Sequence, residues 1–289
     1  MADSLHFERV SHWPGRIYRS QPLNISGLEG ERPVSLWLPP DYPAADAPAT
    51  ERRWPLAVFF DGQNLFGDEG TLGGGWQLHT ALTERANAGA AVPVGIGLHH
   101  GAQRESELSP WDPFPGVSGR AKSQLEWIKT SLLPELYSDL QLDPNPDHCL
   151  VGGSSLGGLL ALYALFHQPE SFGKALVMSP ALWPNRFAIF QDLMLQRPRP
   201  QAKIYLDHGQ REVLEPGKEH FGQILFEQTQ LMADLLEVMG FEPGHRLSWN
   251  PDPEGEHNER CWSRRLPKAL DFLYDNPTNT PIPKNEEET

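Results

Sequence analysis

The chain has 289 residues, with 38 acidic and 24 basic side chains and a formal net charge of −14. This acidic balance argues against nucleic acid or an anionic membrane as a partner, and an anionic ligand would need a local basic pocket. No apolar run approaches the ~20 residues of a membrane span. We expect the protein in the cytoplasm, because the N-terminal residues lack the basic region and hydrophobic core of a secretory signal.

The length and the even composition favour one domain, since no linker is visible between residues 1 and 275. The tail 276–289 is rich in Pro, Asn and Glu, which predicts disorder. Cys149 and Cys261 are too few for a disulfide framework, and no ligand spacing around the histidines resembles a metal site. We therefore expect neither a metal nor another cofactor.

Two short runs bounded by Pro and Gly come first, Ile17–Ser20 and Val34–Leu38, and we expect them to pair as antiparallel strands. Short, nearly continuous apolar runs follow, which is typical of parallel strands buried on both faces. They are Leu56–Phe60, Val94–Leu98, Cys149–Val151, Ala175–Met178, Ile204–Leu206 and Leu247–Trp249.

Helical patterns lie between these runs: Leu78–Ala86, Gln124–Leu140 with a bend at Pro134, Leu156–His167, Phe187–Met194, Phe221–Met239 and Trp262–Tyr274. The alternation predicts an α/β fold, with a mostly parallel, doubly wound sheet and an antiparallel N-terminal strand pair. A functional site is expected at the carboxyl ends of the parallel strands.

The segment Gly153-Ser154-Ser155-Leu156-Gly157 fits G-x-S-x-G and stands between a predicted strand and a predicted helix. This pattern is the nucleophile elbow of the α/β-hydrolase fold, in which the central serine is exposed at the tip of a sharp turn. The start of the following helix presents backbone N–H groups that can stabilise negative charge. The sequence therefore predicts Ser155 as a nucleophile.

A serine nucleophile needs a base, and the base needs a carboxylate, in the chain order serine, acid, histidine. His257 lies in a polar loop between the last predicted strand and the last predicted helix, where the base belongs. His220 at a helix start and His245 before a strand are more simply surface residues. We predict His257 as the base.

The acid is expected after the strand Ile204–Leu206, where Asp207 and Glu212 are the candidates. We favour Glu212, because a loop residue reaches the histidine loop more easily than one still attached to the sheet. Asp207 is the alternative acid, or a carboxylate that caps a turn. Glu215 is a third candidate.

An oxyanion hole needs two backbone N–H groups that converge on the developing charge. Leu156, the residue after the nucleophile, is expected to give one. The other is expected from the loop after Leu56–Phe60, where Gly62 lets the backbone turn and Gln63 is the candidate. An ordinary polar turn is the alternative reading of this loop.

Five segments together resemble the Putative esterase family, which includes enterochelin (enterobactin) esterase-like hydrolases, feruloyl esterase domains, esterase D and mycolyltransferases. They are Phe60–Phe66, Arg104–Pro110, Gly152–Gly158, Ser179–Trp183 and Gly255–His257, within a match from about Pro33 to Tyr274. The resemblance implies the same roles for Ser155, His257, Gln63 and Glu212. Fewer than forty residues precede the first matching strands, so we expect no additional N-terminal domain of the kind that some enterochelin esterases carry.

The substrate pocket is expected to draw on aromatic residues near the strand ends, namely Phe66, Trp76, Trp111 and Trp183, which could stack on an aryl group or simply pack the loops. Arg104, Arg211 and the pair His99-His100 could form a basic pocket for an anionic catecholate siderophore. Arg104 could equally pair with Glu107.

Three functions fit these residues. The first is hydrolysis of a carboxylic ester, such as a siderophore or aryl ester, through an acyl-enzyme on Ser155. The second is transfer of the acyl group to a sugar or another alcohol by the same residues. The third is ligand binding without turnover, which the presence of both Ser155 and His257 disfavours. The oligomeric state has no signal in the sequence.

Overall fold

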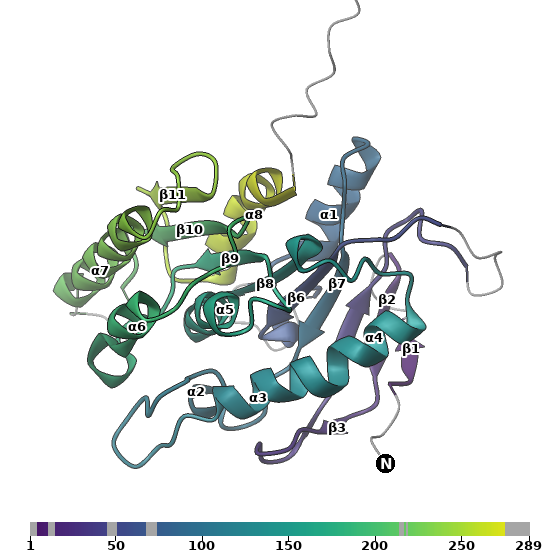
Figure 1. Cartoon of the computed structure of the whole chain (residues 1–289), viewed down its shortest axis with the longest axis horizontal. Coiled ribbons are helices and arrows are strands. Elements are labelled where there is room, and N and C mark those ends of the chain that lie inside the picture. The colour runs from purple at the N-terminus through teal and green to yellow at the C-terminus, as the bar shows by residue number, and fades with distance from the viewer. Residues whose placement is uncertain are drawn as a thin grey trace, which may run out of the picture.

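Nine strands of the described residues form one mixed sheet through the middle of the molecule (Figure 1). The computed structural model describes residues 5–10, 15–44, 51–67, 74–213, 217 and 219–274, so the predicted tail 276–289 lies outside it. The strand order is β1-β2-β5-β7-β6-β8-β9-β10-β11. These strands are β1 (Phe7–Arg9), β2 (Ile17–Ser20), β5 (Val34–Trp37), β6 (Leu56–Phe60), β7 (Val94–Leu98), β8 (Cys149–Ser154), β9 (Lys174–Met178), β10 (Lys203–Gly209) and β11 (Leu247–Asp252).

The six strands β6 to β11 are parallel to one another, whereas β2 and β5 pair antiparallel, as predicted. β5 also pairs antiparallel with β7, and β1 with β2. Every residue of β6, β7 and β8 is buried, because helices cover both faces of this part of the sheet. The predicted fold class is therefore confirmed.

Successive side chains of a strand point to opposite faces of the sheet. In β6, Val58 and Phe60 belong to one core, and Ala57 and Phe59 belong to the other. The first core contains residues of α3 (Ala121–Trp127), α4 (Leu133–Asp139), α5 (Leu156–His167), α6 (Pro184–Met194) and α7 (Glu219–Val238). The second contains residues of α1 (Leu78–Asn87) and α8 (Glu259–Tyr274), and Figure 1 shows these two helices on the same side of the sheet.

The bend expected at Pro134 takes the form of a π-helical turn, Ile128–Leu132, between α3 and α4. Pro134 then stands in the first turn of α4, where its missing N–H leaves no hydrogen bond unmade. The wider turn lets the chain pass the proline without ending the helical path.

Three short strands and one short helix were not predicted: β1, β3 (Leu23–Asn24), β4 (Glu31–Arg32) and α2 (Arg104–Glu107). β3 and β4 pair with each other outside the main sheet. Strands β8, β10 and β11 also run three residues beyond their predicted ends, because polar residues such as Asp207 and His208 continue the hydrogen-bonded ladder. The carboxyl ends of the parallel strands therefore carry polar side chains while still being part of the sheet.

Candidate active site

Ser155 stands at a strained turn between the end of β8 and the start of α5. Its φ of 56° and ψ of −123° are unusual for a residue with a side chain, and such strain persists only where the surroundings enforce it. Two hydrogen bonds fix the turn, since the Ser155 N–H donates to Met178 O at 3.0 Å and the Ala181 N–H donates to Ser155 O at 2.9 Å. Met178 is the last residue of β9 and Ala181 lies in the loop that follows it, so the sheet itself holds the serine.

Gly153 explains why the elbow needs glycine before the serine. A Cβ atom at Gly153 would lie 2.5 Å from the carbonyl carbon of Gly157, in the first turn of α5. No side chain fits in that gap, so the strand can turn this sharply into the helix only with glycine at this position.

His257 lies in the loop between β11 and α8, as predicted, and its Nδ1 atom is 2.7 Å from Glu212 Oε2. The imidazole also packs edge-on against Trp262, with 5.0 Å between the ring centroids. One nitrogen of the imidazole thus contacts a carboxylate, and the ring packs against an indole. These two contacts limit the orientation of the imidazole.

Glu212 is buried and held by several groups in addition to His257. Its Oε1 accepts from the Gly209 N–H at 2.8 Å and from the Ser179 hydroxyl, and His208 Nε2 lies 3.2 Å from its Oε2. Burial alone raises the pKa of Glu212, but the hydrogen bond from His257, the charges of His208 and His257, and the Ser179 bond together lower it to about 2. The carboxylate is therefore anionic across the neutral range.

Asp207, the alternative acid, is a fully buried residue of β10. Its carboxylate lies 3.1 Å from Arg265 Nε and accepts from the Ser179 N–H at 3.1 Å. Burial raises its pKa to about 7, against the opposing charge of Arg265. Within the described chain, the carboxylate in contact with His257 is that of Glu212, and Glu215 lies outside the described residues.

Ser179, Trp262 and Arg265 form a supporting group that sequence reasoning missed. The Ser179 hydroxyl donates to Glu212 and accepts from Trp262 Nε1 at 3.0 Å and from an Arg265 guanidinium nitrogen at 2.9 Å. Trp262 and Arg265 are three residues apart in α8 and so share one helix face. That spacing, directly after the histidine loop, is the sequence signal that could have identified them.

The two predicted oxyanion-hole residues lie in the first turns of helical segments at the same edge of the sheet. Gln63 lies in a 3₁₀ turn, Gly62–Asn64, that follows β6, and Leu156 is the first residue of α5. Amides in the first turn of a helix have no partner within that helix. A Cβ atom at Gly62 would lie 2.4 Å from the carbonyl carbon of Gly97, so only glycine lets this turn pack on β7.

Arg104 holds the loop that carries Gln63. Its Nε and one terminal nitrogen donate to the two carboxylate oxygens of Asp61 at 2.8 and 2.7 Å, which is the bidentate geometry of strong arginine–carboxylate pairs. Asp61 itself adopts a left-handed conformation with φ of 56°. The expected alternative pairing of Arg104 with Glu107 is wrong, because Glu107 pairs with Arg32 at 3.3 Å.

Two other members of the expected basic pocket are paired with a carboxylate or uncharged. Arg211 pairs with Glu254 at 2.6 Å. His99 is buried beside the Ser35 hydroxyl at 2.8 Å, and burial together with the charge of Arg19 lowers its pKa to about 3. His99 is therefore neutral at physiological pH and adds no positive charge to the site.

The four aromatic residues expected at the rim divide into two groups. Phe66 and Trp76 are almost fully buried and belong to the core. Trp111 packs edge-on against Tyr163 with 5.4 Å between centroids, and Trp183 lies 5.1 Å from Phe114. Phe114 is 46% exposed, so the pair Trp183–Phe114 presents aromatic surface to solvent.

Among the residues that the structure describes, no three or more His, Cys, Asp or Glu side chains are grouped so as to hold a metal ion. Within the same residues, no helix is both long and apolar enough to cross a membrane. Both cysteines are buried and free.

The chain is similar to esterases in sequence and in structure. It is 29% identical over 236 residues to iron(III) enterobactin esterase of Escherichia coli (strain K12), a match that covers 81% of this chain and 52% of the relative. The enterobactin esterase FES from Shigella flexneri superposes with a TM-score of 0.67 at 22% identity, over 92% of this chain and 60% of that one. The siderophore hydrolase EstA from Aspergillus nidulans gives 0.68 at 19% identity, over 91% and 96%.

The chain thus spans about half the length of the enterobactin esterase from E. coli and nearly the whole of the fungal hydrolase. The model of one family, described as Putative esterase, matches residues 25–273. This range includes the elbow, the histidine loop and every strand of the parallel part of the sheet. The chain therefore belongs to the Putative esterase family.

Proposed function

We propose that this member of the esterase family hydrolyses carboxylic esters through an acyl-enzyme on Ser155, with His257 as base and Glu212 as the acid partner of His257. The observation that carries the proposal is the 2.7 Å contact between His257 Nδ1 and Glu212 Oε2, at the same edge of the sheet as the strained elbow of Ser155. A strained serine, an imidazole and a buried anionic carboxylate are the parts that nucleophilic acyl transfer requires.

In this mechanism, Ser155 Oγ attacks the ester carbonyl while the imidazole of His257 takes the hydroxyl proton. Glu212 keeps the proton of His257 on Nδ1, so that Nε2 is the basic nitrogen, and its charge stabilises the imidazolium that forms. The backbone N–H groups of Gln63 and Leu156 donate to the carbonyl oxygen as it becomes negative.

Collapse of the tetrahedral intermediate breaks the ester bond, and the imidazolium gives its proton to the departing alkoxide oxygen. The alcohol leaves, and the acyl group stays on Ser155. Water then attacks the acyl-enzyme with His257 again as base, which releases the carboxylic acid and restores the serine hydroxyl. Every proton that His257 takes is returned within one cycle.

For the substrate, we propose a siderophore ester or another aryl ester. The support is the similarity to two relatives, an iron(III) enterobactin esterase and a siderophore hydrolase, together with the exposed pair Trp183–Phe114. Arg104 is bound to Asp61, so its proposed effect on the substrate is through the position of the Gln63 loop. The expected cytoplasmic location belongs to the same proposal, and fractionation of cells that express the protein tests it.

The experiment compares hydrolysis of p-nitrophenyl acetate and butyrate by the wild type, Ser155→Ala and the control Ser123→Ala. Ser123 lies on α3, away from the elbow, and the same atom is removed in both variants. We expect Ser123→Ala to hydrolyse both esters at the wild-type rate and Ser155→Ala at the background rate. Equal hydrolysis by all three proteins would contradict the proposal. If Ser155→Ala alone is inactive, an ester panel read by mass spectrometry defines the substrate.

A further inference from the structure

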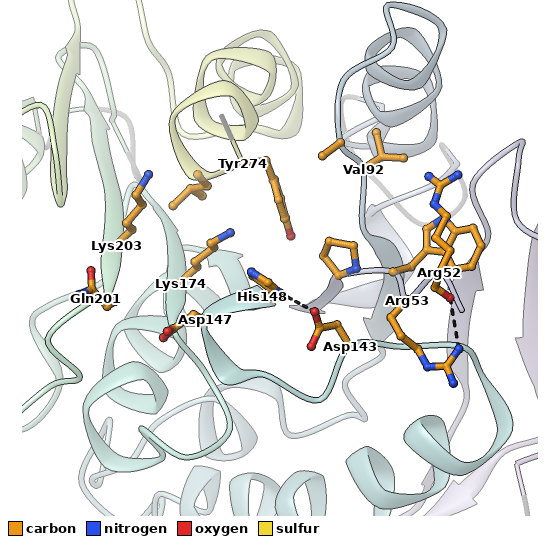
Figure 2. Close-up of a pocket in the computed structure, with 14 residues that line it drawn as sticks. Arg52, Arg53, Val92, Asp143, Asp147, His148, Lys174, Gln201, Lys203 and Tyr274 are labelled. Atoms are coloured by element: carbon orange, nitrogen blue, oxygen red, sulfur yellow. Dashed lines mark hydrogen bonds and ion pairs between the residues drawn. The ribbon is translucent and has the colours of Figure 1, made fainter. Parts of the chain in front are cut away.

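A pocket of about 520 Å³ lies at the edge of the sheet opposite to Ser155 (Figure 2). Trp54 and Pro55 precede β6, His148 precedes β8, and Lys174 and Lys203 are the first residues of β9 and β10. The pocket thus lies at the amino ends of the parallel strands, whereas the candidate active site lies at their carboxyl ends. It shares no lining residue with that site.

Two lysines of adjacent strands line one wall of the pocket. Lys174 and Lys203 are direct partners in the register of β9 and β10, so their side chains leave adjacent strands in the same direction. Figure 2 shows both side chains on the same side of the pocket, with Arg52 and Arg53 on the other side. Four cationic side chains therefore surround the space in a protein whose overall charge is −14.

The two carboxylates in the lining are already paired. Asp143 lies 2.6 Å from His148 Nδ1, and Asp147 accepts from Arg199 Nε at 2.9 Å. Arg52 pairs with Asp41 at 2.5 Å. Lys174, in contrast, forms no ion pair with a described carboxylate, and its ammonium lies over the Tyr274 ring, 4.6 Å from the centroid. The charge of Lys174 is therefore not neutralised by an ion pair within the described part of the chain.

Tyr274 adds a hydrogen-bond donor with no acceptor. Its hydroxyl oxygen is buried and has no hydrogen-bond partner among the described residues. Figure 2 shows the phenol pointing its hydroxyl into the space near His148, toward which the Lys174 side chain also extends. A buried hydroxyl without a hydrogen-bond partner destabilises the protein, and a hydrogen bond to a ligand oxygen would remove this penalty.

The ammonium of Lys174 is also poorly stabilised by its surroundings. Burial and the charge of Lys203 lower its pKa to about 8, the neighbouring Arg85 acts in the same direction, and Asp147 and Cys149 oppose them. An anion with two negative charges between the two lysines would stabilise both cations. A phosphate monoester has that charge near neutral pH.

We propose that this pocket binds a phosphate group, either inorganic phosphate or the phosphate of a small organic molecule, between Lys174 and Lys203. Tyr274 donates a hydrogen bond to a phosphoryl oxygen. The apolar lining of Val92, Pro55 and Leu273 gives room for an organic substituent beside the phosphate. The proposal does not depend on esterase activity, since none of these residues belongs to the candidate active site.

Isothermal titration calorimetry with inorganic phosphate, phenyl phosphate and phenol tests the proposal. It uses the full chain, as wild type and as Ser155→Ala, so that binding at the serine is separated from binding at the pocket. We expect saturable binding of a phosphate probe to both proteins, with equal affinity, and no binding of phenol alone. A higher affinity for phenyl phosphate than for inorganic phosphate would indicate an organic ligand, and equal affinities for the two would indicate free phosphate.

Lys174→Gln and Lys203→Gln are each expected to weaken binding at least about tenfold, because each removes a charged donor. Lys122→Gln, at an exposed position of α3, is the matched control and is expected to bind as the wild type does. Affinity is also expected to fall as the pH rises through about 8, where Lys174 loses its proton.

Two results would overturn the proposal. One is the absence of saturable binding with a Kd below about 10 mM in the wild type. The other is unchanged affinity in both lysine variants, provided that their thermal unfolding matches the wild type. If Lys174→Gln unfolds at a lower temperature than the wild type, the affinity of Lys203→Gln alone decides whether the proposal holds.

Discussion

Glu212 and His257 are 45 residues apart in the sequence, and their carboxylate and imidazole meet at 2.7 Å. Glu212 follows β10 and His257 follows β11, and these neighbouring parallel strands end at the same edge of the sheet. The contact is thus a consequence of topology, because two loops at adjacent strand ends come together in any doubly wound sheet.

Glu212→Gln is expected to lower kcat by about a hundredfold or more with a small change in KM, since the amide cannot stabilise the imidazolium. Steady-state kinetics on p-nitrophenyl butyrate measure this. Glu254→Gln, at an exposed residue that pairs with Arg211, is the control and should keep the wild-type rate. A larger decrease in kcat for Asp207→Asn than for Glu212→Gln would give Asp207 the role assigned to Glu212.

The stability of the protein should depend on Glu212 at low pH. Its pKa lies at about 2 in the folded protein and at 4.5 in the unfolded reference, a difference worth about 3 kcal/mol. Because the folded pKa is the lower one, this stabilisation is complete above about pH 4.5 and disappears as the pH falls toward 2. Urea unfolding of wild type and Glu212→Gln between pH 2 and 7 checks this: the difference in unfolding free energy should shrink with acidification, and a constant difference would contradict it.

Ser179→Ala tests the group that holds Glu212. The substitution leaves the donors of Trp262 and Arg265 without their acceptor, which should reduce the unfolding free energy by about 1–3 kcal/mol. If Ser179 also positions Glu212, kcat should fall while KM stays unchanged, and Ser179→Thr should restore part of the loss. Full activity in Ser179→Ala would limit this serine to a structural contribution.

Gly153→Ala is expected to disable the elbow, because its Cβ would meet the backbone of Gly157 at 2.5 Å. The matched variant is Gly240→Ala, where φ is 92° but no atom lies within 4 Å of the new Cβ. Left-handed strain alone costs about 1–2 kcal/mol. The midpoint temperature of thermal unfolding should therefore fall further for Gly153→Ala than for Gly240→Ala. Similar decreases in the two variants would show that crowding at the elbow is unimportant.

Arg104→Lys should lower kcat about tenfold, because a lysine cannot hold both carboxylate oxygens of Asp61 in the bidentate geometry. The effect acts through the Gln63 turn, so kcat should change more than KM. A rise in KM alone would instead indicate that Arg104 binds the substrate directly.

Local patterns predicted the regular parts of this structure well. The apolar run Leu56–Phe60 and the helix Leu156–His167 have the predicted ends, because a glycine-bounded turn and a continuous buried face mark them in the sequence. The extension of β10 through Asp207 and His208 was not predictable, since polar residues inside a strand interrupt the apolar pattern.

Contacts between distant segments were harder to predict. The pairing of Arg104 with Asp61 joins positions 43 residues apart, whereas Glu107, the alternative partner that the sequence suggests, stands only three residues away. Ser179 likewise meets Arg265 across 86 residues. Charge and spacing identify residues that can pair, but the sheet topology decides which of them do.

The most direct test of the central proposal is labelling of the protein with an organophosphorus reagent, followed by mass spectrometry of its peptides. We predict one adduct, on Ser155, which forms in parallel with the loss of hydrolysis and forms much more slowly in His257→Ala. Full inactivation with the adduct on another residue, or continued hydrolysis after complete labelling of Ser155, would contradict the account.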